Sequence, residues 1–146
     1  MIKSILTVCI GNVCRSPVAE VCLKQMLPTL DIASAGFDAP PGRPASPVMV
    51  DLAKNAGLDL SRHKARRFSD AAPARYDLIL VMETWHLDMI ARRQPALRPR
   101  AMLLTQWSTK ASIPDPIREG PEFNATVFND IQAACLTWAK KVELRL

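Results

Sequence analysis

The chain lacks any hydrophobic run long enough to cross a bilayer. Its first apolar stretch begins near Ile5 and is broken by Gly11, Asn12 and Arg15, whereas a membrane-spanning helix needs about 20 apolar residues. Cysteine is also scarce in these 146 residues, which contain only Cys9, Cys14, Cys22 and Cys135. In a chain that is 49% hydrophobic, so few thiols are more typical of a reduced cytosolic protein than of a secreted disulfide framework. We therefore expect a cytoplasmic protein without membrane insertion.

Metal-binding, ATP-binding and nucleic-acid-binding patterns are missing as well. His63 and His86 stand alone, and Cys9 and Cys14 have no second pair at zinc-binding spacing, so we expect no metal and no other cofactor. The Gly-Lys-Ser/Thr ending of an ATP-type phosphate loop is absent. Aromatic residues are only 5% of the chain and do not alternate with its basic clusters, which disfavours a nucleic-acid or non-catalytic phosphate-binding module. The net charge of +5 favours acidic or phosphorylated partners.

Short apolar runs alternate along the chain with amphipathic stretches. Strands are expected at residues 5–8, 32–35, 78–82 and 101–104. Strands that alternate with helices predict an α/β fold with three layers, in which helices cover both faces of a four-stranded parallel sheet. Because there is no internal repeat, low-complexity tract or linker, we expect one domain over residues 1–146.

Helix start signals follow two of these strands. Ser16 can cap a helix that begins directly after Arg15, with Pro17 in its first position. Ser46 repeats this signal before a second helix, for which Gly57 is a suitable left-handed terminator. Two further helices are expected at residues 85–93 and 121–142.

The loop after the first strand is the most informative segment, because it places a cysteine and an arginine, with five residues between them, between a strand and a helix. A loop of this length can curl until its backbone N–H groups and the N-terminus of the next helix converge on a tetrahedral dianion. Gly11 and Asn12 tolerate the positive φ that such a turn requires. The predicted phosphate-binding loop consists of Ile10, Gly11, Asn12, Val13, Cys14 and Ser16.

Cys9 and Arg15 are the predicted catalytic pair of this loop. N–H dipoles and a fixed guanidinium favour the thiolate, which is the nucleophilic form of cysteine. The planar fork of Arg15 can bind two phosphoryl oxygens at once, and Ser16 can donate to the sulfur as it leaves. Alternatively, Cys9 merely ends a buried strand and Arg15 forms a surface ion pair. The Gly-Asn and Ser-Pro neighbours and the strand-to-helix context favour the catalytic interpretation.

Asp115 is the candidate proton donor for the leaving group. It lies between Pro114 and Pro116, which restrict the backbone and can hold a carboxyl group above the loop. Loops that follow parallel strands emerge at the same edge of the sheet, so Asp115 and Cys9 are expected to meet there. An ordinary Asp-Pro turn is the alternative interpretation.

With these motifs, the sequence resembles the low-molecular-weight protein tyrosine phosphatase family over essentially the whole chain. The matching segments are Cys9 to Pro17, Ser34-Ala-Gly, Gly42-Arg-Pro, His63-Lys-Ala-Arg66, Asp77 to Met82 and Pro114-Asp-Pro116. The resemblance implies a phosphocysteine intermediate on Cys9, with Asp115 first as acid and then as the base that activates water. It also implies that Asn12 shapes the loop with support from His63.

The resemblance extends to partners and to redox chemistry. Bacterial members imply a phosphotyrosine protein as partner, such as a tyrosine kinase that controls exopolysaccharide export. We expect a monomer or weak dimer. Cys14 is then a redox partner that protects Cys9 from over-oxidation through a reversible disulfide, or it is simply a small buried loop residue.

The expected substrate slot departs from the family pattern. Ile117 follows the Asp-Pro pair where members often carry tyrosine, and Phe37 stands in a loop where some carry tryptophan. Both are predicted slot residues, although Phe37 would fit the core equally well. The nearest alternative function is arsenate reduction on the same fold. That reaction needs resolving cysteines downstream, and the chain has none between Cys22 and Cys135.

Overall fold

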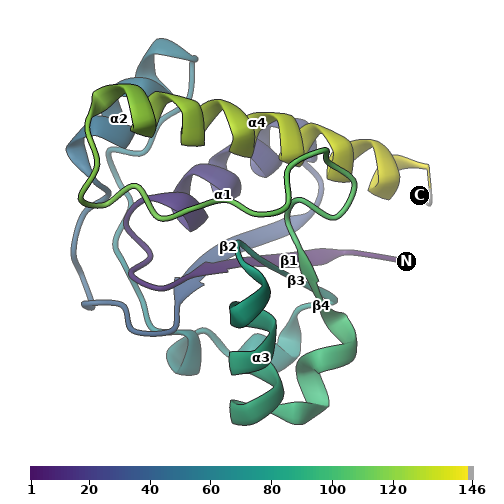
Figure 1. Ribbon diagram of the computed structural model, residues 1–146. Coiled ribbons are helices and arrows are strands. Elements are labelled where there is room, and N and C mark those ends of the chain that lie inside the picture. Colours follow the sequence, from purple (N-terminus) through teal and green to yellow (C-terminus); the bar gives the residue numbers. More distant parts are fainter. Residues whose placement is uncertain (145–146) are drawn as a thin grey trace.

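A parallel sheet forms the centre of the protein, whose computed structural model describes residues 1–144 (Figure 1). The strands are β1 (Ser4–Cys9), β2 (Asp31–Gly36), β3 (Leu78–Val81) and β4 (Ala101–Leu103). They pair in the order β2-β1-β3-β4, and every pair is parallel. Each strand lies within one residue of its predicted bounds at either end, and the predicted α/β fold is confirmed.

Helices cover both faces of the sheet, as Figure 1 shows. One face carries α1 (Arg15–Met26), α2 (Pro47–Asn55) and α4 (Pro121–Glu143), and the other carries α3 (Thr84–Arg93). Short 3₁₀ segments complete the second layer, at Phe68–Ala71, Pro73–Arg75 and Pro95–Arg100. Because both faces are covered, β3 and β4 consist of apolar residues only and β1 mostly so, which is why they stood out in the sequence, whereas the edge strand β2 also carries Asp31 and Ser34.

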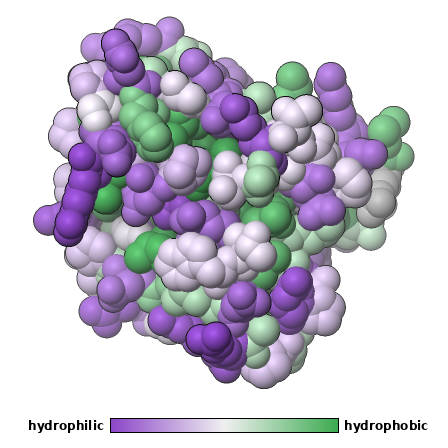
Figure 2. Space-filling model, viewed as in Figure 1, coloured by the Kyte–Doolittle hydropathy of each residue, from purple (hydrophilic) through white to green (hydrophobic). Residues whose placement is uncertain are grey.

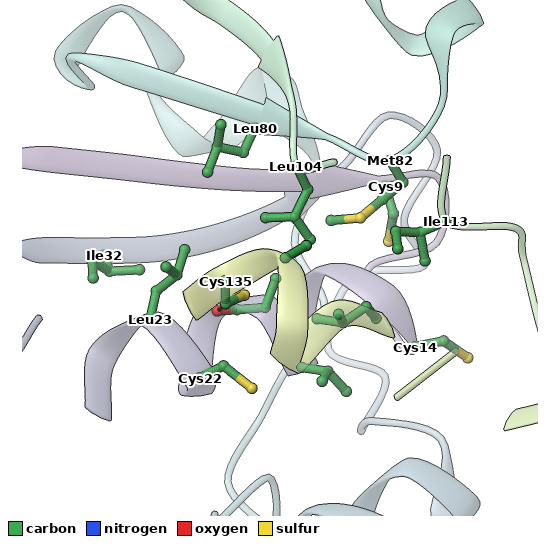
Figure 3. Packing of buried hydrophobic residues seen from close by; sticks show 14 of the residues in the cluster. Cys9, Cys14, Cys22, Leu23, Ile32, Leu80, Met82, Leu104, Ile113 and Cys135 are labelled. Atoms are coloured by element: carbon green, nitrogen blue, oxygen red, sulfur yellow. Dashed lines mark hydrogen bonds between the residues drawn. The ribbon is translucent and has the colours of Figure 1, made fainter. Parts of the chain in front are cut away.

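Two apolar cores lie on opposite sides of the sheet, because neighbouring strand residues point to opposite faces. Ile5 and Leu80 pack toward α1 and α4, whereas Leu6 and Ile79 pack toward α3. Figure 3 shows the first core, in which α1 and α4 pack together below the strands and Cys135 of α4 lies close to α1. Burial of these apolar side chains is the main stabilising contribution to the fold.

Helix starts and ends agree with the sequence signals except at α1. Gly57 follows α2 with φ of 79°, as predicted for a left-handed terminator. The helix α1, however, begins at Arg15 with Cys14 in the N-cap position. The prediction that Ser16 caps this helix was therefore wrong, because Ser16 lies inside the first turn and its hydroxyl is used elsewhere.

The strand order places a crevice at the carboxyl ends of the two central strands. After β1 the chain crosses to the face of α1, and after β3 it crosses to the face of α3. Open parallel sheets bind ligands where the connections that follow two neighbouring strands run to opposite faces of the sheet. Among residues 1–144, no helix combines the length and the hydropathy needed to span a membrane.

Candidate active site

The loop between β1 and α1 folds back over the sulfur atom of Cys9. The backbone N–H of Asn12 donates to Cys9 Sγ at 3.3 Å, and Asn12 adopts a positive φ of 55° to do so. Within the described residues, the N–H groups of Gly11, Val13 and Cys14 have no protein acceptor. The first turn of α1 supplies further free N–H groups. A loop with so many free donors beside a helix N-terminus is suited to bind an anion.

Ser16 connects the sulfur to a buried polar network. Its Oγ lies 3.0 Å from Cys9 Sγ and accepts a hydrogen bond of 2.8 Å from Asn12 Nδ2. The hydroxyl hydrogen of Ser16 then has two acceptors within reach, Cys9 Sγ at 3.0 Å and the Ala35 carbonyl at 3.3 Å. The same Asn12 amide donates to Ser34 Oγ at 3.0 Å, and Ser34 Oγ lies 2.6 Å from a carboxylate oxygen of Glu20. These contacts hold the loop and stabilise negative charge on the sulfur.

Contacts to both the side chain and the backbone carbonyl of Asn12 hold this residue in its positive-φ conformation. Asn12 Oδ1 accepts from the backbone N–H of Arg66 at 2.9 Å, and its carbonyl oxygen lies 2.6 Å from Nε2 of His63. His63 thus contacts the loop as the resemblance implied. Gly36 lies directly behind this turn, where a Cβ would come within 2.4 Å of the Ile10 carbonyl oxygen and 2.9 Å of the Asn12 nitrogen. Any larger residue at position 36 would push the loop out of place.

Arg15 is almost fully buried and its guanidinium is oriented by two acceptors. Nη1 donates to Glu83 Oε2 at 2.7 Å and to the Ile113 carbonyl at 2.8 Å, and Nη2 lies 3.7 Å from Asp115 Oδ2. Glu83 directly compensates the buried positive charge. Sequence reasoning missed Glu83, although its position two residues after a buried strand at the ligand-binding edge was a usable signal.

His86 supports Glu83 from the start of α3. Its Nδ1 accepts from the backbone N–H groups of Met82 and Glu83, and its Nε2 lies 3.5 Å from Glu83 Oε2. Burial, and secondarily the nearby Arg15 cation, lower the pKa of His86 to about 4. His86 is therefore neutral at physiological pH, and its buried Nε2 forms no hydrogen bond within the described residues, although it lies 3.5 Å from the carboxylate that holds Arg15.

Asp115 forms an Asp-Pro turn and also lies beside Arg15, so both interpretations of this residue from the sequence describe part of its geometry. Its Oδ1 accepts from the Ile117 N–H at 3.0 Å, which is an Asp-Pro turn, while Oδ2 faces Arg15. The side chain is about half exposed, at 45%. The preceding Ile113 is fully buried, and its N–H donates to the Met82 carbonyl at 2.9 Å, so the turn is anchored to the end of β3.

A pocket of about 210 Å³ opens above Cys9, and we call it the Cys9 pocket. Its lining residues are Cys9, Ile10, Gly11, Val13, Cys14, Arg15, Pro40, Arg43, Asp115 and Ile117. The structure thus brings the three predicted catalytic side chains together around one hollow. Figure 3 shows Cys9 at the end of its strand, beside Met82 and Ile113.

Of the two predicted slot residues, only Ile117 lines this pocket. Phe37 is packed in the second core instead, with its ring centroid 5.1 Å from that of Phe68 and the Arg93 guanidinium 5.6 Å from its own. The slot prediction for Phe37 was wrong because a large apolar side chain that follows a buried strand is taken up by the core. Pro40 and Arg43, farther along the same loop, line the pocket in its place.

The other cysteines lie in different surroundings. Cys14 is buried at the pocket wall, and burial raises its pKa to about 11. Burial also raises the pKa of Cys135 well above its ordinary value. Over residues 1–144, no group of His, Cys, Asp and Glu side chains could hold a metal ion.

Comparison with known proteins agrees with this geometry. Residues 4–145 match the family described as "Low molecular weight phosphotyrosine protein phosphatase". The chain belongs to this family. Wzb of Escherichia coli K12, a low molecular weight protein-tyrosine-phosphatase, is 38% identical over 140 residues, which are 96% of this chain and 95% of Wzb. These matches confirm the predicted family and enzyme class and favour the phosphatase over the arsenate reductase alternative.

Solved structures of family members superpose closely on the chain. The tyrosine phosphatase Wzb from Escherichia coli K30, in complex with sulphate, gives a TM-score of 0.94 at 39% identity and covers 97% of this chain and 99% of its own. Vibrio vulnificus Wzb with benzylphosphonate gives 0.92 at 36% identity, with coverage of 97% and 99%. The arginine phosphatase YwlE of Geobacillus stearothermophilus gives 0.90 at 28% identity, with coverage of 97% and 94%.

Proposed function

We propose that the protein hydrolyses phosphotyrosine in other proteins through a phosphocysteine intermediate on Cys9. The observation that carries this proposal is the convergence of Cys9, Arg15 and Asp115 on one pocket beneath a loop of free N–H donors. A sulfur anion, a guanidinium and a carboxyl group are the three groups that a two-step phosphoryl transfer requires. The whole chain serves this one site as a single domain.

In the first step, the Cys9 thiolate attacks phosphorus while the bond to the tyrosine oxygen breaks. Arg15 and the loop N–H groups bind the three equatorial oxygens, whose charge is spread in the transition state. Asp115 donates its proton to the departing phenolate. The products are a tyrosine side chain and phosphocysteine, with Asp115 now ionised.

In the second step, ionised Asp115 takes a proton from water, and the water oxygen attacks phosphorus. The sulfur–phosphorus bond breaks and inorganic phosphate leaves. Ser16 stabilises the returning thiolate, because its hydroxyl lies 3.0 Å from the sulfur and is oriented by Asn12. The cycle uses no metal ion and no cofactor.

The partner that we propose is a tyrosine-phosphorylated protein, and a bacterial tyrosine kinase of exopolysaccharide export is the specific candidate. The relative Wzb is named as a tyrosine phosphatase, which supports this class of partner. We propose that the enzyme acts in the cytoplasm as a monomer or weak dimer. Size-exclusion chromatography with light scattering tests the oligomeric state.

The test of this function is a comparison of matched substrates. We expect hydrolysis of para-nitrophenyl phosphate in the presence of EDTA, and faster hydrolysis of a phosphotyrosine peptide than of the same peptide with phosphoserine. A phosphoarginine peptide belongs in the set, because the Geobacillus arginine phosphatase shares the fold at 28% identity. Equal rates on all three peptides would refute the preference for phosphotyrosine. If none of these substrates is hydrolysed, the phosphatase assignment itself is refuted.

We further propose that Cys14 protects Cys9 against oxidation. Peroxide converts the Cys9 thiolate to a sulfenic acid, and the Cys14 sulfur then displaces water to form a disulfide. Both cysteines line the same pocket, which supports the pairing. The expected result is that dithiothreitol restores activity after peroxide treatment of the wild type, but not of Cys14→Ser. Equal recovery of both proteins would contradict this role.

A further inference from the structure

A second hollow adjoins the Cys9 pocket. We call it the proline hollow; its volume is about 360 Å³, and its lining residues are Val13, Arg43, Pro44, Ala45, Ser46, Pro47 and Ile117. Val13, Arg43 and Ile117 also line the Cys9 pocket. The two hollows are therefore parts of one groove, divided by a ridge of shared residues.

The proline hollow is apolar and held in place by the backbone. The rings of Pro44 and Pro47 and the side chains of Val13 and Ile117 supply its surface. The backbone N–H of Ser46 donates to the Val13 carbonyl at 2.8 Å, which ties this segment to the phosphate loop. Prolines and a fixed backbone lose little conformational entropy when a ligand binds.

Ile117 is an exposed apolar side chain at the ridge, with 53% of its surface accessible. On the face drawn in Figure 2, apolar surface appears as small patches between hydrophilic residues rather than as one broad area. A hollow with an exposed isoleucine at its rim thus suits one apolar side chain rather than a large protein interface.

Arg43 gives the ridge a positive charge that the protein leaves unbalanced. It is exposed, and no Asp or Glu of residues 1–144 comes within ion-pair distance of its guanidinium. Its backbone is fixed, because its carbonyl accepts from the Ala65 N–H at 2.8 Å. Arg15, in contrast, is already paired with Glu83 at 2.7 Å. Arg43 is therefore the cation available to a carboxylate of the substrate.

We propose that the groove selects phosphotyrosine sites by their neighbours: an apolar side chain within two positions of the phosphotyrosine fills the proline hollow, and an acidic side chain beside it pairs with Arg43. This inference rests on the proposed function, because the phosphotyrosine itself must occupy the Cys9 pocket. The peptide backbone crosses the ridge of Arg43 and Ile117. An extended chain advances about 3.3–3.6 Å per residue, so a neighbouring side chain reaches the adjoining hollow.

The test is a set of phosphotyrosine peptides that differ only at the neighbouring positions. One carries alanines, one leucine, one glutamate, one lysine, and one both leucine and glutamate. For the wild type we expect kcat/KM on the doubly substituted peptide to exceed that on the alanine peptide by about tenfold. Equal values for all peptides would overturn the inference, while hydrolysis of the alanine peptide would leave the proposed function standing.

Variants separate the two contacts. Arg43→Glu is expected to reverse the order of the glutamate and lysine peptides while the preference for leucine persists. Ile117→Ser is expected to reduce the leucine preference while the glutamate preference persists. Arg92→Gln removes an exposed cation from the far end of α3 and should change neither preference. Loss of the glutamate preference in Arg92→Gln would show that this preference reflects overall charge and would overturn the assignment to Arg43.

Binding gives an answer independent of catalysis. The same peptides, made with phosphonomethyl-phenylalanine in place of phosphotyrosine, can be titrated into wild-type protein by calorimetry. The order of Kd values should follow the order of kcat/KM. If no peptide is hydrolysed but the Kd values follow this order, the groove selects peptides as proposed and only the proposed phosphatase function is refuted. Equal Kd values for all peptides would refute peptide selection by the groove.

Discussion

Cys9 and Cys135 are both buried cysteines, but their surroundings differ in every respect that matters for reactivity. Cys9 ends a strand at an open pocket, where it receives an N–H at 3.3 Å and has a hydroxyl at 3.0 Å. Cys135 lies between α4 and α1 in the apolar core, where burial raises its pKa. From this comparison we infer that the hydrogen-bond donors around a thiol, rather than its burial alone, suit Cys9 to act as the nucleophile.

The largest expected effect comes from removing the sulfur of Cys9. Cys9→Ser should reduce kcat on para-nitrophenyl phosphate by about 10⁴-fold or more, because a serine hydroxyl remains protonated and is a poor nucleophile here. The variant should still bind phosphate, since Arg15 and the loop N–H groups are retained. Steady-state assays and phosphate titrations measure the two properties. Substantial turnover by the variant would refute the assignment of Cys9 as the nucleophile.

The next effect tests the acid at the rim of the pocket. Asp115→Asn should lower kcat on a phosphotyrosine peptide by about 10²–10⁴-fold with little change in KM. A phosphate ester with a better leaving group needs less protonation, so its first step should slow less. Glu119→Gln removes a carboxylate from the same exposed loop and serves as the matched control. Equal losses in both variants would point to general electrostatics instead of proton donation.

A smaller effect concerns the pH dependence of stability. His86 is neutral in the folded protein with a pKa of about 4, below its ordinary value of 6.5. The unfolded chain therefore binds more protons between these values, so stability falls as the pH decreases from about 6.5 to about 4. The full contribution is about 3 kcal/mol of unfolding free energy.

His86→Asn isolates this contribution, because asparagine can still accept the N–H bonds of Met82 and Glu83 but does not titrate. Urea unfolding at several pH values should give a flatter dependence for the variant than for the wild type. Parallel curves would show that His86 does not control acid stability. A change in KM for phosphate esters would report the loss of support for Glu83 and Arg15.

The smallest effect returns to the core cysteine. Cys135→Ala should leave kcat unchanged and lower the unfolding free energy by about 1 kcal/mol, because it removes one packed sulfur and leaves a small cavity. Urea unfolding and activity assays on the same sample measure both quantities. A variant that unfolds like the wild type but loses activity would contradict the contrast drawn between the two thiols.

The fold could be predicted from the sequence because its signals are local. Each strand is a short apolar run, and the predicted helix at residues 121–142 differs from α4 by a single residue. Ser16 misled the helix prediction, because a serine near a helix start resembles a cap whether its oxygen faces the backbone or a sulfur. Asp115 could be identified because two prolines mark it.

The rest of the site depends on contacts that no local pattern records. In the sequence, only its position two residues after a buried strand distinguishes Glu83 from a surface acid, and the sheet order brings it to Arg15, 68 residues earlier in the chain. Phe37 was wrongly assigned to the substrate slot, because its position in a loop after the second strand gave no information on which way its ring points. Gly36 was visible only as part of a family motif. Glycine is needed at this position because Ile10 and Asn12 approach it closely, and this is a tertiary contact.

The acceptors of the Arg15 guanidinium come from the middle and the final third of the chain, 68 and 98 residues later. During synthesis, the signature loop leaves the ribosome among the first segments, yet its arginine lacks the second of its two orienting acceptors until Ile113 has followed. We therefore expect phosphatase activity only after Ile113 has been synthesised. Truncated products that end before residue 113 contain the whole motif, and we expect them to be inactive.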